Sequence, residues 1–213
     1  MTPRFPADIS IPLIHPRSDK GYTLIRADAL PDTREIRADL TSACNEPLIY
    51  GWLFRERCEG RPYDEMNASS FMVWMHRGWQ ERAFFVFALL SPCGRLVGVL
   101  DIKSAEVEGA EVGYWLSQRH SGLMTLALSE LQVLAGQAGF RSLSARVRPG
   151  NERSLAVVRR AGWKDTGLEW PVNICASSGK VKKPQPRPGS LVPEAHSAEM
   201  RASAFSSLRV ILP

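Results

Sequence analysis

The hydrophobic pattern changes its period in the middle of the chain, and this change restricts the fold more than any other feature of the sequence. Residues 83–90 (AFFVFALL) form a continuous apolar run, a Pro-Cys-Gly turn leads into a second run at 96–102 (LVGVLDI), and a third follows at 111–116 (EVGYWL). Such runs separated by short connections predict an antiparallel meander of three strands. Residues 124–138 then repeat apolar side chains with a helical period, which predicts an amphipathic helix that Gly139 ends.

Shorter elements are predicted on both sides of this centre. Residues 45–60 mix aromatic and turn residues and are assigned to no regular element. The remaining predictions are strands at 22–26, 142–148 and 163–168, and helices that follow the turn-rich 28–32 through Leu40, at 67–80 with Asn67 or Ser69 as cap, and at 152–160. This order predicts an α/β (α+β) fold, with a mixed, mostly antiparallel sheet flanked by helices rather than a doubly wound parallel sheet.

Composition limits the class of protein. With 213 residues, 44% hydrophobic and 23% charged, the chain reads as one ordinary globular domain with an extension, which excludes a collagen or a coiled coil. No apolar run approaches the ~20 residues that cross a bilayer, so we expect neither a signal peptide nor contact with a membrane. The four cysteines are far apart without a Cys-x-x-Cys pair, and the four histidines are scattered. We therefore expect a cytoplasmic protein without a metal site.

The positive charge is concentrated near the end of the chain. Residues 179–213 hold six basic and two acidic side chains, so they carry +4 of the net charge of +5. The rest is nearly neutral, so a nucleic-acid partner is not expected for the folded part. We predict an N-terminal extension at 1–20, a folded domain at 21–170, and a Pro/Lys-rich, poorly ordered tail at 171–213. A short strand at 208–212 stays open, and after Leu168 the sheet edge is expected to be incomplete.

Three local features point to chemistry: the strand at 111–116, the polar loop that opens the long helix, and an Asn-x-x-Ser turn at Asn151 and Ser154. The amides of a first helical turn have no intrahelical acceptor, and with Gly122 allowing close approach they suit a phosphate or pyrophosphate. Arg119 would add a bidentate charge. The alternative is that Ser121 is only a helix cap and Gly122 only a turn residue.

The segment from Tyr22 to Leu168 resembles the GNAT superfamily of acyl-CoA-dependent N-acetyltransferases, in particular its ribosomal-protein N-terminal acetyltransferases. The resemblance is strongest over 96–163 and includes VLDIKS, EVGYWL, NERS and RAGW. The family's phosphate loop, Gln/Arg-x-x-Gly-x-Gly/Ala, places Arg119, Gly122 and Met124 at its fixed positions, and Met124 departs from it. In an alternative register Gly122 is the second glycine and His120 replaces the first. Both registers stay open.

The resemblance implies that acetyl-CoA is the co-substrate and that its pantetheine arm lies between two splayed strands. The implied cofactor-binding residues are Val112, Gly113, Tyr114, Trp115, Arg119, His120, Ser121, Gly122, Leu123, Met124 and Asn151. It also implies direct attack without an acyl-enzyme, and thiolate protonation by Ser154. From the residues themselves, Glu111 is the first candidate base, acting through water with a pKa raised by burial, and Asp101 is the second. The alternatives are an exposed strand residue for Glu111, a strand cap for Asp101, and helix caps for Asn151 and Ser154.

We therefore predict an N-acetyltransferase that moves an acetyl group from acetyl-CoA to a primary amine, either a protein N-terminus or a small molecule. Two other classes remain: an acyl-CoA or partner-binding protein of the same shape without turnover, and a nucleic-acid-associated protein that uses 180–187 as a basic arm. A homodimer is left open. Aromatic side chains that are predicted mostly as core, with an acceptor pocket as the alternative, are Trp52, Phe54, Phe71, Trp74 and Trp79.

Overall fold

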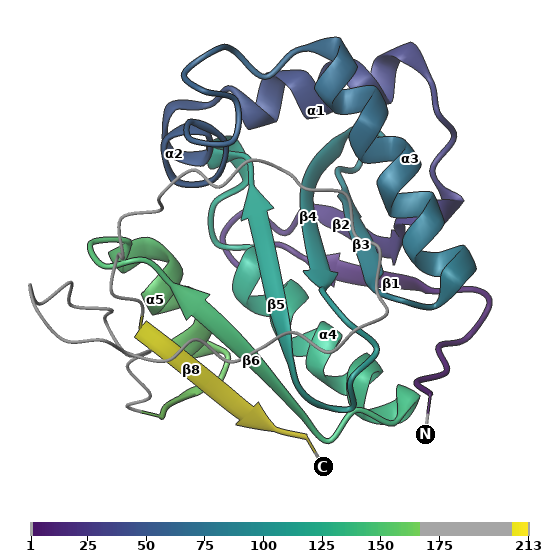
Figure 1. Cartoon of the computed structure of the whole chain (residues 1–213), viewed down its shortest axis with the longest axis vertical. Coiled ribbons are helices and arrows are strands. Elements are labelled where there is room, and N and C mark those ends of the chain that lie inside the picture. Colours follow the sequence, from purple (N-terminus) through teal and green to yellow (C-terminus); the bar gives the residue numbers. More distant parts are fainter. Residues whose placement is uncertain (1, 167–205, 213) are drawn as a thin grey trace, which may run out of the picture.

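One mixed sheet organises the molecule. The computed structural model describes residues 2–166 and 206–212, and within them eight strands form a sheet in the order β1-β2-β3-β4-β5-β6-β8-β7 (Figure 1). Neighbouring strands are antiparallel except β5 and β6, which run parallel. The predicted fold class is confirmed. The strands are β1 (Ser10–Ile14), β2 (Gly21–Arg26), β3 (Phe85–Leu90), β4 (Leu96–Ile102), β5 (Glu108–Leu116), β6 (Ser142–Val147), β7 (Lys164–Asp165) and β8 (Ser206–Ile211).

Helices cover both faces of this sheet. They are α1 (Arg34–Cys44), α2 (Pro47–Ile49), α3 (Glu65–Glu81), α4 (Met124–Ala138) and α5 (Glu152–Arg160), with 3-10 turns η1 (Ala27–Ala29) and η3 (Gln118–His120). The unassigned 45–60 segment contains α2 and a π-helical turn, η2 (Tyr50–Phe54). The cap predicted for α3 is wrong: its first turn is capped by Asp64, whose carboxylate accepts from the Asn67 amide at 2.9 Å.

The core lies in two layers, one on each side of the sheet. One face packs against α4 through Leu128 and Leu131, and the other packs against α1 and α3 through Leu40 and Met72 (Figure 1). All four side chains are buried. A sheet covered on both faces explains why the strand runs at its centre are continuously apolar rather than alternating.

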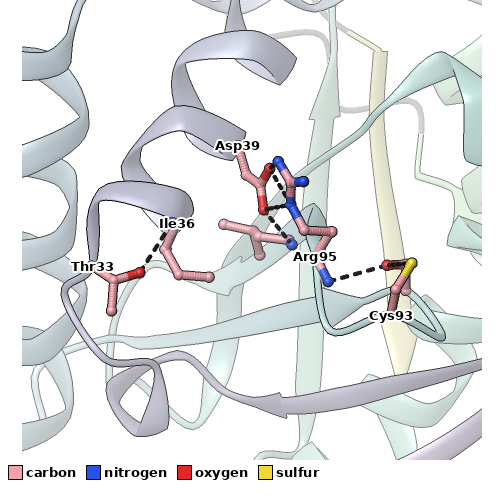
Figure 2. Close-up of polar contacts among 7 residues, drawn as sticks. Thr33, Ile36, Asp39, Cys93 and Arg95 are labelled. Carbon is pink, nitrogen blue, oxygen red and sulfur yellow. Dashed lines mark hydrogen bonds and ion pairs between the residues drawn. The ribbon is translucent and has the colours of Figure 1, made fainter.

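A buried carboxylate fastens α1 to the β3–β4 hairpin. Figure 2 shows the Asp39 side chain directed at Arg95, whose Nε donates to both carboxylate oxygens at 2.9 Å. The Leu96 amide donates to the same carboxylate at 3.0 Å. Asp39 is 7% exposed, so these donors replace the water that its charge would otherwise bind.

Both ends of the described chain add strands to the sheet. β1 lies within the predicted N-terminal extension, and its Pro12 is tolerated because β1 is an edge strand. The strand expected at 208–212 is present as β8, which pairs along β6, so the expectation of an incomplete edge is wrong. Residues 167–205 of the predicted strand end and tail lie outside the described residues. Among described helices, none has the length and apolar character needed to cross a membrane.

Candidate functional site

The site begins where two parallel strands separate. β5 and β6 pair at Glu108↔Ser142, Ala110↔Leu143 and Glu111↔Ser144. Beyond Glu111, β5 stays paired with β4 as far as Leu116↔Gly98, whereas its pairing with β6 ends. Figure 1 shows the two strands diverging toward their C-terminal ends. From Val112 onward, one edge of β5 therefore has no neighbouring strand among residues 2–166 and 206–212.

Alternation along β5 decides which backbone groups face this gap. The Lys103 amide donates to the Glu111 carbonyl at 2.8 Å, and the Ser117 amide donates to the Val97 carbonyl at 2.9 Å, so the odd-numbered residues bond toward β4. Because successive residues point to opposite sides of a strand, the amides of Val112 and Tyr114 point toward β6 and the gap. Of the predicted segment 112–115, Gly113 and Trp115 turn their backbone groups the other way.

A cavity of about 810 Å³ occupies this region. It brings together most of the predicted site residues: Glu111, Val112, Gly113, Tyr114, Trp115, Ser121, Gly122, Met124, Asn151 and Ser154. Arg119, His120 and Leu123 are not among the residues that line it. Leu48, Trp52 and Leu53 form an additional apolar wall from α2 and η2. Trp52 is thus the one of the five predicted aromatic side chains that lines the cavity, within the part of the chain that the structure describes.

The loop before α4 leaves its helical amides available. Leu123, not Ser121, occupies the cap position of α4, and no side chain caps the helix there among the described residues. The interpretation of Ser121 as an N-cap is therefore wrong. Gly122 has a φ of +111°, which favours glycine over any residue with a side chain. The first turn keeps the unpaired amides and the positive dipole end that suit an anion.

Neighbouring elements hold this loop in place. The Ser117 hydroxyl and the Gln118 amide donate to the two carboxylate oxygens of Glu46, at 2.6 and 2.7 Å. On the other side, His120 Nδ1 lies 2.8 Å from the Tyr22 hydroxyl, and Leu123 is fully buried in the core. Burial lowers the pKa of His120, and Glu46 opposes this only in part. His120 and Leu123 therefore anchor the loop from outside the cavity.

Glu111 does not have the electrostatic character expected of it. Its carboxylate oxygens lie 2.5 Å from Lys103 Nζ and 2.5 Å from an Arg146 nitrogen. Burial raises the pKa of Glu111, but the hydrogen bonds and positive charges of Lys103 and Arg146 outweigh burial, so its pKa is lowered. The expected rise in this pKa is wrong, because two cations from β6 and the end of β4 share one carboxylate.

Asp101 has the opposite character. Burial raises its pKa, while Lys103 and the Gly113 amide partly oppose this. Its Oδ1 accepts from the Gly113 amide at 2.7 Å, and a Cβ built at Gly113 would lie only 2.5 Å from that oxygen. The missing side chain at Gly113 therefore makes room for the carboxylate. Asp101 lies within β4 rather than capping it, as the cross-strand partner of cavity-lining Gly113 on β5.

The start of α5 faces the gap from the other side. Asn151 caps this helix, since its Oδ1 accepts from the Ser154 amide at 3.2 Å. The Ser154 hydroxyl lies 2.7 Å from the Tyr114 hydroxyl, which also donates to the Ser154 carbonyl at 3.1 Å. Burial raises the pKa of Tyr114 to about 12, although the Ser154 hydrogen bond lowers it. The sequence predicted a role only for the backbone of Tyr114. The contact between its phenol and Ser154 was missed because the two residues lie 40 positions apart in the sequence.

Cysteines and metal ligands contribute little to this site. None of Cys44, Cys58 and Cys93 lines the cavity, and burial strongly raises the pKa of the Cys44 thiol. Cys175 lies outside the described residues. In the described part of the chain, no group of three or more His, Cys, Asp or Glu side chains is arranged to hold a metal ion.

Comparison with known proteins identifies a family. The family model of the acetyltransferase (GNAT) domain matches residues 31–164. No curated protein matches the chain significantly. Solved structures with the same fold include a putative ribosomal-protein-serine acetyltransferase from Vibrio cholerae, at 18% identity over 99% of both chains with a TM-score of 0.61. Mycobacterium smegmatis RimJ with CoA-disulfide is 17% identical over 99% of this chain and 90% of its own, with a TM-score of 0.64.

A third structure with this fold is the microcin C7 self-immunity acetyltransferase MccE, in complex with acetyl-CoA and AMP. It is 15% identical over 92% of this chain and 94% of its own, and its TM-score is 0.64. At these identities the likeness concerns the fold.

Proposed function

The chain belongs to the GNAT acetyltransferase family, and on that premise we propose that it transfers an acetyl group from acetyl-CoA directly to a primary amine. The observation that carries the proposal is the separation of β5 from β6 beyond Glu111, next to the uncapped start of α4. Within the described part of the chain, both the free edge of β5 and the start of α4 offer backbone groups that can hydrogen-bond a ligand.

Acetyl-CoA fits these features from end to end. The diphosphate would lie against the Met124 amide and the backbone of Gly122, where no side chain obstructs its approach. The pantetheine arm would run along β5 and bond to the amides of Val112 and Tyr114, which face the gap. The cavity of about 810 Å³ falls within the usual size of a ligand pocket, ~300–1,000 Å³. The structures of RimJ and MccE, which hold CoA-disulfide and acetyl-CoA, support this choice of co-substrate.

The transfer requires one bond to form and one to break. The amine nitrogen attacks the thioester carbonyl, a C–N bond forms, and the C–S bond breaks to release the CoA thiolate. A β5 amide facing the gap stabilises the oxyanion that develops on the carbonyl oxygen. The Ser154 hydroxyl, held by Tyr114 and by the Asn151 cap, delivers a proton to the thiolate. No covalent acyl-enzyme is needed.

The amine must lose a proton, and we propose Asp101 rather than Glu111 as the acceptor. A raised pKa makes a carboxylate a stronger base, whereas Glu111 is held as an anion by two cations. Asp101 does not line the cavity, so the proton would pass through water beside Gly113 and Lys103. Asp101→Asn should abolish the acidic limb of the pH–rate profile, and Glu111→Gln should retain it.

The acceptor is a protein N-terminus or a small molecule, and the protein works in the cytoplasm. The apolar wall of Leu48, Trp52 and Leu53 would contact the body of the acceptor beside its amine. Basic side chains outnumber acidic ones among the residues that line the cavity, where the acidic residues are Glu111 and Glu152 and the basic ones are Arg17, Lys103, Arg146, Arg148, Arg153 and Arg160. This balance does not favour a polyamine.

Calorimetric titration with acetyl-CoA, followed by a thiol-release screen over peptides and small amines, tests the proposal. Binding followed by thiol release with at least one class of amine is expected. A protein that binds acetyl-CoA and releases no thiol would instead be the acyl-CoA-binding protein of the same fold, an alternative favoured by the double ion pairing of Glu111. Failure to bind acetyl-CoA would refute both.

A further inference from the structure

The turn between β1 and β2 lies against the loop that precedes α4. Residues 15–20 form this turn, and the His15 carbonyl accepts from the amides of Ser18 and Asp19 at 3.3 and 3.1 Å. The turn belongs to an edge hairpin that precedes the residues matched by the family model, 31–164. Its internal hydrogen bonds fix its shape before any ligand arrives.

His15 connects the turn to the loop in one tautomer. The Arg17 amide donates to His15 Nδ1 at 3.2 Å, so Nδ1 acts as an acceptor and Nε2 carries the hydrogen. Nε2 then donates to the Ser121 carbonyl at 3.2 Å. Only 8% of His15 is exposed, and its Nε2 would lie 3.6 Å from a Cβ placed at Gly122. The imidazole thus fixes the loop at the residue where its backbone takes the left-handed conformation.

Arg17 brings a positive charge to the same place. It lines the cavity together with Ser121, Gly122 and Met124, whereas Arg119, the arginine of the loop itself, does not. Over residues 2–166 and 206–212, no carboxylate forms an ion pair with Arg17. Asp19 lies in the same turn, and the carboxylate of Glu46 is already bonded to Ser117 and Gln118 of the loop. A guanidinium in this position can donate two parallel hydrogen bonds to phosphate oxygens.

We propose that Arg17 binds the diphosphate of the CoA moiety at the start of α4, and that His15 is a positioning residue that sets the loop for this contact. The inference rests on the proposed function, because it takes acetyl-CoA as the ligand. The cation of the phosphate site then comes from the β1–β2 turn and not from the loop motif. The unpaired amides of α4 and the Arg17 guanidinium approach the diphosphate from two sides.

Calorimetric affinities of Arg17→Gln for CoA and for dephospho-CoA, which lacks the 3′-phosphate, test the role of Arg17. We expect the dissociation constants for CoA and for dephospho-CoA to rise by the same factor, ~10-fold, because each ligand retains the diphosphate. The affinity should also fall less steeply with added salt than in the unsubstituted protein. Lys20→Gln is the matched control: it removes one charge from the same turn, its side chain does not line the cavity, and its affinities should be unchanged.

His15 is tested by a conservative pair of substitutions. His15→Leu removes the donor to Ser121 and should weaken CoA binding, while His15→Gln keeps an amide donor of similar reach and should restore most of the affinity. Thermal unfolding of both variants separates this rescue from a loss of fold, since equal melting temperatures with unequal affinities are expected. Equal affinities for both variants would contradict the positioning role.

The outcomes separate this inference from the proposed function. Unchanged affinity in Arg17→Gln overturns the inference alone, and so does a loss confined to CoA, which would assign Arg17 to the 3′-phosphate. If the unsubstituted protein binds no CoA, the proposed function fails and the inference fails with it.

Discussion

Gly113→Ala tests whether the position of the Asp101 carboxylate depends on the absence of a side chain on β5. The added Cβ would lie 2.5 Å from Asp101 Oδ1 and 3.0 Å from Lys103 Cε. Relief of the oxygen contact needs a shift of roughly 0.9 Å to reach ordinary van der Waals separation. Oδ1 accepts from the Gly113 amide at 2.7 Å, so a shift away from the residue lengthens this bond to about 3.6 Å, beyond the range of a good N–H···O bond.

The cost follows from the bond that is lost. A hydrogen bond to a charged group contributes about 1.5–3 kcal/mol, and burial of the new methyl group returns about 0.8 kcal/mol. We therefore expect Gly113→Ala to lower the free energy of unfolding by about 1–2 kcal/mol, or the melting temperature by about 5 °C for a chain of this length. Urea and thermal unfolding measure both quantities. Gly21→Ala is the control, because its Cβ would meet no atom within 4 Å.

A double-mutant cycle shows whether the steric argument is right. In an Asp101→Ala background the oxygen is absent, so the added methyl group at residue 113 should cost nothing. The coupling energy between the two substitutions should therefore be about 1–2 kcal/mol, the cost expected for Gly113→Ala alone. A coupling energy within about 0.5 kcal/mol of zero would refute the reasoning. It would mean that the carboxylate moves aside freely and that Gly113 has another role.

Tyr114→Phe removes the phenol that holds Ser154, so thiol release should slow by about tenfold at saturating substrate while calorimetric CoA affinity stays within about twofold; equal rates would contradict the proton-delivery role. Glu111→Gln should lower the free energy of unfolding by about 1 kcal/mol at pH 7, since its partners are half exposed. The pKa of Glu111 is lower in the folded than in the unfolded protein, so this stabilisation is present above the unfolded pKa and disappears as the pH falls through the folded pKa. The free energies of unfolding of the two proteins, measured by chemical denaturation, should therefore converge in acid. Asp39→Ala leaves the buried Leu96 amide without its acceptor and should cost about 2–3 kcal/mol in urea unfolding; a negligible loss would show that this amide does not depend on Asp39. Gly122→Asp should weaken calorimetric CoA affinity at least about tenfold, because it places a carboxylate and a strained φ at the proposed phosphate site; normal affinity in the folded variant would show that the phosphates lie elsewhere.

The sequence predicted those elements whose cause is local. Periodicity and turn residues located β3, β4 and α4 to within a few residues, since these follow from apolar spacing and from Gly139, which takes a left-handed conformation at the end of α4. The same rules missed β1, because Pro12 weakens the strand signal and is tolerated only through the edge position. The 45–60 segment was not assignable, since a three-residue helix followed by a π-helical turn has no characteristic period.

Prediction of the site depended on how far apart its interacting residues lie in the sequence. The strand, loop and turn that line the cavity were found because each is a short continuous segment. Charge and protonation were predicted less well, because they are set by groups from other elements: Arg146 reaches Glu111 from β6, and the Gly113 amide of β5 donates to Asp101 on β4.

The loop before α4 illustrates why a motif alone cannot locate the charges that serve it. Its sequence contains Arg119, and a reading confined to the loop assigns the phosphate to that arginine. In the folded chain the loop is held by Glu46, the residue before α2, and by His15 from the β1–β2 turn, 71 and 106 residues away from their partners. These contacts fix the backbone so that Arg17, rather than Arg119, lines the cavity beside Gly122. A backbone that provides amides to an anion can be recognised from a short segment, whereas the cation that completes the site depends on which distant turn the sheet brings beside it.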